Sequence, residues 1–295
     1  MKIIVLGGSG MWGHQAFLKL STHFGQNNVA CTLRKPKDYY DKIQIYKNSP
    51  VYDQVDFRFP DSAFNCLNDF KPDWVINCVG LTPRKYDVKN EPLFYQINAE
   101  LPHLLATWVR DNKSKLIHFS TDCVFTGKKG NYTENDIPDA QDVYGRSKAQ
   151  GEVKAPRVLT YRLSKIGREI EGKTEIVEWL LSQKGKAVKG FSRAFYSGLT
   201  TNYMAEELIR MIDNFPHLEG LYQVSSHKIT KYELLKLIND VYHCGVEIQE
   251  NSEYAVDKSL SCDAYSEATG FKKPHWLEMI KNMKNEERID YDGFK

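Results

Sequence analysis

Tyr144 and Lys148 are four residues apart in the stretch DVYGRSKAQGE, residues 142–152. At this spacing two side chains share one face of a helix, so the lysine ammonium would lie beside the tyrosine phenol. A neighbouring positive charge stabilises the phenolate and lowers a pKa that is ordinarily about 10, which suits a general acid–base catalyst. The same spacing also arises by chance in surface pairs. The surrounding elements must decide between the two interpretations.

Hydroxyl and carboxyl side chains are expected close to this pair. The apolar run at 115–120 ends in Ser120, and Thr121 and Asp122 follow it directly. Ligands of open parallel sheets bind just outside the carboxyl ends of the strands. A hydroxyl at this point could hold a carbonyl oxygen while Tyr144 protonates it. The alternative is that these side chains only satisfy backbone groups of a turn.

A glycine-rich loop, VLGGSGMWG, follows the first apolar run and precedes a helical pattern. Its G-x-x-G-x-x-G spacing suits a tight turn, close approach of the backbone to a diphosphate, and close packing of a helix on a sheet. The N-terminus of that helix would offer N–H groups to the phosphates. We therefore predict a dinucleotide site. The residues expected to contact the cofactor in this loop are Gly7, Ser9, Gly10, Met11, Trp12 and Gly13.

The end of the second apolar run indicates which dinucleotide binds. Arg34 and Lys35 follow this run, and no acidic residue appears before Asp38. A cation here suits the 2′-phosphate of NADP, whereas NAD sites place an acid on the ribose. The sequence thus favours NADPH, although both residues could be solvated loop charges. Further cofactor contacts are expected from Asp56, at the adenine edge, and from Cys78, Val79 and Gly80, as a floor under the cofactor.

The elements that would position these residues form an α/β pattern. Short β-branched runs alternate with amphipathic helical stretches, which predicts a Rossmann-like, doubly wound parallel sheet. The predicted strands lie at 2–7, 28–33, 73–80, 115–120, 157–163 and 220–226.

The pattern loosens after about residue 164, which suggests a second lobe made of separate segments. We assign 1–163 and 205–243 to a nucleotide-binding domain. The segments 164–204 and 244–295 are assigned to a smaller, mixed α/β substrate-binding lobe.

Composition argues against several classes of partner. The chain has 295 residues, of which 41% are hydrophobic and 26% charged, with a net charge of +2. This charge gives no field that would favour nucleic acid or an anionic membrane. No apolar run approaches the roughly 20 residues that span a bilayer, and the N-terminal run is too short for a signal peptide. We therefore expect a cytoplasmic protein, with its six scattered cysteines as buried thiols and no metal site.

Four strings together resemble the extended short-chain dehydrogenase/reductase superfamily, and within it the dTDP-4-dehydrorhamnose reductase family. They are VLGGSGMWG, NCVG, HFSTDCVFTGKKGNYTENDIPDAQDVYGRSKAQGE and TYRLS. The resemblance implies that Thr121, Tyr144 and Lys148 are catalytic. It further implies that NADPH delivers a hydride to the C4 ketone of a nucleotide-linked 6-deoxyhexulose. In that scheme Tyr144 protonates the oxygen, Thr121 holds it, and Lys148 bonds the nicotinamide ribose.

The chain also departs from the family pattern. Arg84 and Lys85 are unusual in the segment that follows the string NCVG. The glycine-containing segment near residue 190 matches the family pattern only in outline. Asp122, Lys189 and Arg193 are candidates for substrate binding, the last two through the substrate diphosphate, although they could be solvated charges. The sugar and the base stay open, and a UDP-linked N-acetylated 6-deoxyhexulose would fit nearly as well.

The same scaffold also suits two other functions. An NAD-dependent nucleotide-sugar epimerase or dehydratase is disfavoured by Arg34 and by the Cys123 that follows Asp122. A non-catalytic, NADP-binding regulatory partner resembles the regulatory subunit of methionine adenosyltransferase, a relative of this family. The intact Thr121, Tyr144 and Lys148 argue against a purely structural role. The resemblance also suggests a homodimer.

Overall fold

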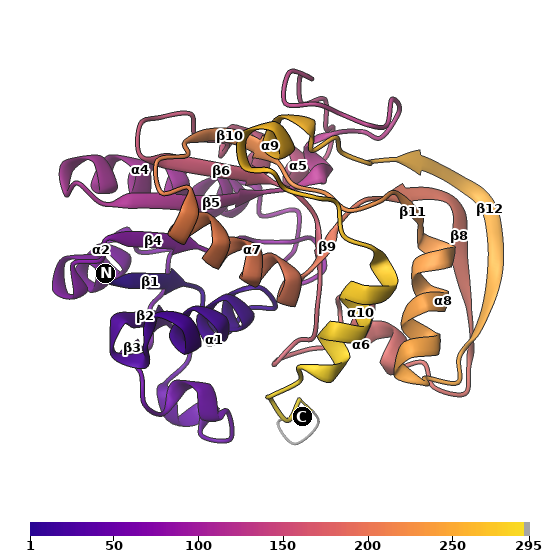
Figure 1. Cartoon of the computed structure of the whole chain (residues 1–295), viewed down its shortest axis with the longest axis horizontal. Helices are drawn as coiled ribbons and strands as arrows, with labels where there is room; N and C mark the ends of the chain where they lie inside the picture. The colour runs from indigo at the N-terminus through magenta and orange to yellow at the C-terminus, as the bar shows by residue number, and fades with distance from the viewer. Residues whose placement is uncertain (292–295) are drawn as a thin grey trace.

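A seven-stranded parallel sheet forms the centre of the computed structural model, which describes residues 1–291. Its strand order is β10-β6-β5-β4-β1-β2-β3 (Figure 1). The strands are β1 (Ile3–Leu6), β2 (Val29–Thr32), β3 (Val51–Tyr52), β4 (Trp74–Asn77), β5 (Lys115–Ser120), β6 (Val158–Arg162) and β10 (Gly220–Gln223). Each of the six predicted strands is confirmed. The sequence missed β3, a two-residue strand at the sheet edge.

Helices cover both faces of this sheet. They are α1 (Gly13–Phe24), α2 (Pro60–Phe70), α3 (Glu91–Tyr95), α4 (Leu101–Asp111), α5 (Val143–Gln150) and α7 (Thr201–Asn214). Ile3 and Val5 of β1 belong to the core shared with α1 and α7, whereas Ile4 and Leu6 belong to the core shared with α2 and α4. Successive side chains of a strand point to opposite faces. A strand buried on both faces is therefore apolar at every position, as the sequence pattern predicted.

The order of the strands defines where a ligand would bind. β1 pairs with β2 on one side and with β4 on the other, so the chain reverses its direction of travel across the sheet at this point. Ligands of doubly wound sheets bind at such a switch point, outside the carboxyl ends of the strands. The glycine-rich loop lies at the carboxyl end of β1, and Thr121 lies at that of β5.

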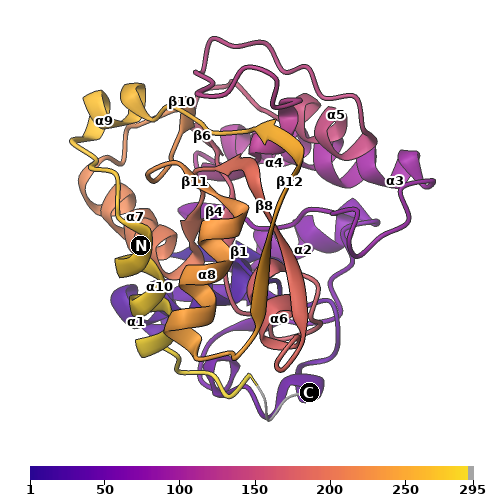
Figure 2. The same ribbon diagram turned by 90° about the vertical axis from the view of Figure 1, so that its right-hand side faces the viewer.

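A smaller lobe lies beside the large sheet (Figure 1). Its strands are β7 (Lys165–Ile166), β8 (Ala187–Tyr196), β9 (Leu199–Thr200), β11 (Ile229–Thr230) and β12 (Glu247–Asp257), and its helices are α6 (Ile176–Leu181), α8 (Lys231–Tyr242) and α10 (Trp276–Asn285). β11, β8 and β12 form one sheet, and β7 pairs with β9. Figure 2 shows α8 alongside the ribbon of β8 and β12.

The packing of α8 bears on the predicted division into domains. Within 205–243, β10 joins the large sheet, whereas α8 packs on β8 of the smaller lobe. The packing is close, because a Cβ added at Gly190 of β8 would lie only 3.0 Å from the Cα of Tyr232 in α8. We therefore propose that the boundary lies between β10 and α8. Of the predicted segment 244–295, residues 292–295 lie outside the described part of the chain.

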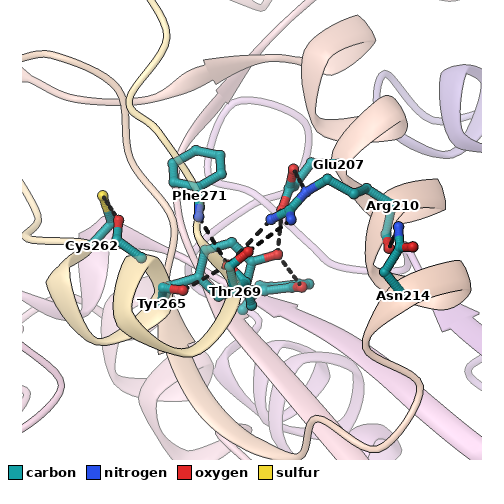
Figure 3. Close-up of polar contacts among 9 residues, drawn as sticks. Glu207, Arg210, Asn214, Cys262, Tyr265, Thr269 and Phe271 are labelled. Atoms are coloured by element: carbon teal, nitrogen blue, oxygen red, sulfur yellow. Dashed lines mark hydrogen bonds and ion pairs between the residues drawn. The ribbon is translucent and has the colours of Figure 1, made fainter.

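Part of that segment returns to the large sheet through α9 (Asp263–Thr269). Buried Glu207 of α7 pairs with Arg210 at 2.6 Å and accepts a hydrogen bond from the Tyr265 hydroxyl. Arg210 also donates to the carbonyl of Thr269 at 3.0 Å, as Figure 3 shows. These bonds fix α9 to α7. Within residues 1–291 no helix has the length and apolar content needed to cross a bilayer.

Candidate active site

The glycine-rich loop has the close packing that its sequence predicted. Gly7 has a φ of +79°, which few residues with a side chain adopt. A Cβ at Gly13 would lie 2.0 Å from the Gly7 carbonyl oxygen, so only glycine lets α1 start this close to the loop. Gly10 is exposed, and its N–H donates to the Gly7 carbonyl at 3.1 Å. The loop is thus a tight turn with an open outer edge.

The start of α1 fits an anionic ligand. Its N-cap residue, Trp12, makes no side-chain capping bond, and the Gly13 N–H, unlike that of His14, which donates to the Gly10 carbonyl at 3.1 Å, stays available to a phosphate. The Trp12 indole N–H is buried, yet it has no acceptor among the described residues. A buried donor without a partner is costly, and a bound group with acceptor oxygens would satisfy it. Ser9 and Met11, the other predicted contacts, are half-buried in the same loop.

The predicted floor lies against this loop. Cys78 donates its backbone N–H to the Leu6 carbonyl at 3.0 Å, and a Cβ at Gly7 would lie 3.2 Å from the Val79 side chain. Gly80 is exposed at the end of this segment. The structure therefore brings the predicted floor residues and the glycine-rich loop together.

Asn98 supports the floor, and sequence reasoning missed it. Its side chain is fully buried, accepts from the Leu81 N–H at 2.8 Å, and donates to the Leu81 carbonyl and to the Ser147 hydroxyl, both at 3.1 Å. It thereby links the floor to α5. An asparagine within the apolar helical pattern FYQINAELPHLL was the available signal, because a buried amide needs polar partners.

The two predicted phosphate-binding cations differ in their surroundings. Arg34 is exposed at the end of β2 and donates to the Tyr86 hydroxyl at 2.6 Å. Lys35 forms an ion pair of 2.7 Å with Glu171, which also accepts a hydrogen bond from the Tyr40 hydroxyl. Arg34 is therefore the cation that a 2′-phosphate could reach without first breaking an ion pair.

Asp56, expected at the adenine edge, is held by an arginine. Arg58 donates to its carboxylate through Nε at 2.9 Å and through Nη2 at 2.6 Å. These bonds are the main cause of the lowered pKa of Asp56, and Arg34 also faces the carboxylate. Arg58 thus adds a second guanidinium at this edge. The sequence placed it two residues after Asp56, but no pattern singled it out.

Thr121 and Tyr144 meet at the carboxyl end of β5. Thr121 donates from its hydroxyl to the Asp122 carboxylate at 3.1 Å and accepts from the Cys123 N–H at 3.2 Å. The Thr121 side chain also lies close enough to the Tyr144 phenol to act on its pKa. The two hydroxyls predicted to act on a carbonyl oxygen therefore lie near each other.

Lys148 differs from its predicted role. Its Nζ donates to the Phe119 carbonyl at 2.6 Å. Burial, the largest cause, raises the pKa of the Tyr144 phenol, where the sequence predicted that Lys148 would lower it. Burial and the nearby Lys165 lower the pKa of Lys148 itself to about 7. Helical spacing placed the two residues on one face, but it did not reveal that both would be withdrawn from water, which disfavours their charged forms.

The start of α5 explains how Tyr144 is positioned. Asp142 caps the helix by accepting from the Gly145 N–H at 2.8 Å. A Cβ at Gly145 would lie 2.4 Å from both the Cys123 carbonyl oxygen and the Ala140 Cβ. The glycine therefore lets α5 pack directly on the strand-end segment that carries Thr121. The phenol and the threonine hydroxyl meet because these two backbones touch.

A buried ion pair stands behind the site. Arg162 pairs with Glu152 at 2.6 Å, and their side chains are 2% and 6% exposed. Ser120 donates its hydroxyl to the same carboxylate at 2.7 Å. The Ser120 hydroxyl is thus engaged by the ion pair behind the site, whereas the Thr121 hydroxyl donates to Asp122 within the site.

The two predicted diphosphate-binding residues lie at different distances from this site. Lys189 and Arg193 are exposed on β8, at positions that alternate with its buried residues. Tyr196, at the end of β8, faces Asp122, whereas Lys189 is seven residues earlier, which is about 23 Å along an extended strand. Arg193 is three residues before Tyr196, which is about 10 Å along the strand and nearer to the site. Asp122, in contrast, is buried within it.

Other lysines surround Asp122 instead. The charges of Lys165, Lys231 and Lys258 all interact with its carboxylate. Lys231 lies at the N-terminus of α8, with its Nζ 3.8 Å from the centre of the Tyr196 ring. Lone lysines far apart in sequence give no spacing signal, so only the fold reveals that they meet.

Arg84 and Lys85, the unusual cations of the floor segment, bind the second lobe. Arg84 pairs with Glu175 at 3.1 Å, and Lys85 pairs with buried Glu169 at 2.6 Å. With Lys35 and Glu171, three ion pairs fasten residues 169–175 to the nucleotide-binding side. Residues 1–291 include no group of three or more His, Cys, Asp or Glu arranged to hold a metal ion.

Comparison with known proteins agrees with this geometry. The family described as "RmlD substrate binding domain" matches residues 1–289. Methionine adenosyltransferase 2 subunit beta of Bos taurus is 24% identical over 82% of this chain and 72% of its own length. The dTDP-4-dehydrorhamnose reductase of Aggregatibacter actinomycetemcomitans is 34% identical, but over 34% of this chain and 35% of its own length.

The fold is also that of a solved structure. The dTDP-4-dehydrorhamnose reductase of Bacillus anthracis, in complex with NADP, aligns with a TM-score of 0.75 and 20% identity. The alignment covers 97% of this chain and 99% of the other. The predicted Rossmann-like architecture is confirmed.

Proposed function

The chain belongs to the RmlD substrate binding domain family, and we propose that it is an NADPH-dependent oxidoreductase that reduces a nucleotide-linked keto sugar. The substrate class we favour is a nucleotide-linked 6-deoxyhexulose with a ketone at C4. The proposal places the enzyme in the extended short-chain dehydrogenase/reductase superfamily.

One observation carries this proposal: the Tyr144 and Thr121 hydroxyls meet at the carboxyl end of β5, with Lys148 on the same helix as Tyr144. A ketone oxygen placed between the two hydroxyls would accept a hydrogen bond from each of them. Such positioning lowers the barrier to attack on the carbonyl carbon. The relatives named as reductases agree with this chemistry.

NADPH, when bound, supplies the hydride. The residues that would hold it are the glycine-rich loop for the diphosphate, Arg34 with Arg58 for the 2′-phosphate, and the floor segment 78–80. Support comes from the uncapped start of α1, the unpartnered Trp12 indole N–H and the exposed guanidinium of Arg34.

Proton transfer is the task of Tyr144. Because burial raises its pKa, the phenol keeps its proton at neutral pH and is a donor to the ketone oxygen. Thr121 holds that oxygen. Lys148 keeps a positive charge close to the site at and below its pKa of about 7.

The direct test follows the loss of reduced nicotinamide absorbance with a panel of nucleotide-linked 4-keto sugars. We expect NADPH oxidation with at least one of them. Tyr144→Phe should lose most turnover, about 100-fold or more, while it binds NADPH as tightly as the wild type. Unchanged turnover in this variant would contradict the role of Tyr144, and no oxidation with any sugar would contradict the reductase.

A second candidate is a non-catalytic subunit that binds a nucleotide and serves a partner enzyme. The similarity to methionine adenosyltransferase 2 subunit beta favours it, because that match covers 82% of the chain. A protein that binds NADPH and oxidises it with none of the sugars would support this candidate. We keep a cytoplasmic location and a homodimer as proposals, the dimer to be tested by sedimentation.

A further inference from the structure

Lys165 is a half-buried lysine that the proposed chemistry does not use. It opens β7, three residues after β6 ends. Its Nζ lies 4.8 Å from the centre of the Phe119 ring and 5.6 Å from that of the Trp12 ring. These rings belong to β5 and to the glycine-rich loop. The ammonium is therefore directed into the crevice at the carboxyl edge of the sheet.

The charge of Lys165 has no counter-ion at close range. Among residues 1–291, neither a hydrogen bond nor an ion pair reaches its Nζ. The groups that face it are Asp122, Cys78, the buried His118 imidazole and the ammonium of Lys148. Burial raises the pKa of the Cys78 thiol, which is therefore neutral. The Asp122 carboxylate acts on Lys165 through its charge, without an ion pair between them. By contrast, Lys35 and Lys85 each pair directly with a glutamate.

Lys165 keeps its positive charge for most of the time at neutral pH. Burial, the largest cause, lowers its pKa to about 8, and the charge of the Asp122 carboxylate acts in the opposite direction. A solvated lysine would titrate near 10.4. The ammonium is thus a fixed and poorly screened charge inside the crevice.

Its neighbours locate it along a bound dinucleotide. Trp12 belongs to the loop that would hold the diphosphate, and Cys78 belongs to the floor. The Phe119 carbonyl accepts from Lys148, the residue that would bond the nicotinamide ribose. Lys165 therefore lies between the groups expected at the diphosphate and those expected at the nicotinamide end.

We propose that Lys165 makes the protein bind the reduced dinucleotide more tightly than the oxidised one. The inference rests on the proposed function. The two forms carry the same phosphates and differ by one positive charge on the nicotinamide ring. A fixed ammonium close to that ring raises the free energy of the oxidised complex alone. Two unit charges several ångströms apart, at the effective dielectric constant of about 20 used for proteins, repel strongly enough to change the ratio of the affinities roughly tenfold or more.

The test measures dissociation constants for NADPH and for NADP⁺ by isothermal titration calorimetry. It compares the wild type with Lys165→Met, which keeps the length of the side chain without its charge, and with Lys165→Arg, which keeps the charge. The matched control is Lys231→Met, another half-buried lysine that interacts with Asp122 but lies over Tyr196 in the second lobe. Thermal unfolding without nucleotide checks that each variant is folded.

We expect the wild type to bind NADPH at least tenfold more tightly than NADP⁺. Lys165→Met should reduce this preference about tenfold, mainly because it binds NADP⁺ more tightly than the wild type does. Lys165→Arg and Lys231→Met should retain the preference of the wild type. An equal weakening of both forms would assign Lys165 to a phosphate and overturn the proposal. An unchanged ratio would also overturn it. If the folded wild type bound neither nucleotide, the proposed function itself would fail.

Discussion

Replacing Gly145 by alanine tests whether catalysis depends on backbone contact at the start of α5. Gly145 does not have the positive φ that alanine rarely adopts, so helix propensity alone would stabilise the variant by about 1 kcal/mol. The new Cβ, however, would lie 2.4 Å from the Cys123 carbonyl oxygen and from the Ala140 Cβ. Contacts this short require α5 or the strand-end segment to move.

The size of the movement decides the outcome. Ordinary carbon contacts begin at 3.4 Å, so an overlap of about 1 Å has to be relieved. Overpacking of this kind costs about 1–3 kcal/mol, which exceeds the gain in helix propensity. Because Tyr144 lies on α5 and Thr121 on the segment it touches, the same shift would separate their hydroxyls. A misplacement of about 1 Å can reduce turnover about 100-fold.

The assay combines urea denaturation with steady-state kinetics on a sugar that the wild type reduces. Gly145→Ala should unfold at a lower urea concentration and lose most of its kcat. Arg146→Ala is the matched control, since this neighbouring side chain is 47% exposed and pairs with Glu91 at 3.6 Å on the surface. A Gly145→Ala protein that was more stable than the wild type and fully active would refute the reasoning.

Three further predictions concern the surroundings of the site. Glu152→Gln leaves buried Arg162 without its counter-ion and should cost about 3–5 kcal/mol in chemical denaturation; a loss under about 1 kcal/mol would contradict the role of this ion pair. Between pH 7 and about 10, the free energy of unfolding should increase as the pH rises. The reason is that Lys148 has a pKa of about 7 in the folded protein, so in this range it binds a proton only in the unfolded chain. Lys148→Met should remove about 1.4 kcal/mol per pH unit from this slope, and parallel curves would refute the assignment. Arg34→Ala should weaken the binding of NADPH about tenfold in fluorescence titrations, with little effect on the binding of NADH. Equal effects on the two affinities would show that Arg34 does not contact the 2′-phosphate.

Local patterns predicted the frame of the molecule and the edge of the sheet at which the candidate site residues lie. The six apolar runs became strands of the large sheet because burial on both faces demands continuous apolar sequence. Thr121, Tyr144 and the glycine-rich loop meet because parallel strands bring their carboxyl ends to one edge of the sheet. Both inferences needed only the order and the periodicity of the chain.

The partners of charged groups were not predictable in the same way. Lys35 pairs with Glu171, 136 positions away, and Lys85 pairs with Glu169. Lys189 and Arg193 carried the right charge in a plausible segment, and the alternation of β8 leaves both of them exposed. The sequence shows that a residue is charged, but it does not show which residue of opposite charge lies next to it. Pairing depends on the packing of the two lobes, which no local pattern encodes.

Burial explains why the protonation states differ from those that spacing predicted. It raises the pKa of Tyr144 and lowers that of Lys148 to about 7, since both charged forms lose their hydration at the sheet edge. For a reduction this combination is suitable. The donor must hold its proton at neutral pH, and a phenolate left in the same dry site is unstable and must regain a proton. We propose that Lys148, a buried group on the same helix with a pKa of about 7, supplies it. On this argument the spacing of Tyr144 and Lys148 serves to return the proton, more than to stabilise a phenolate.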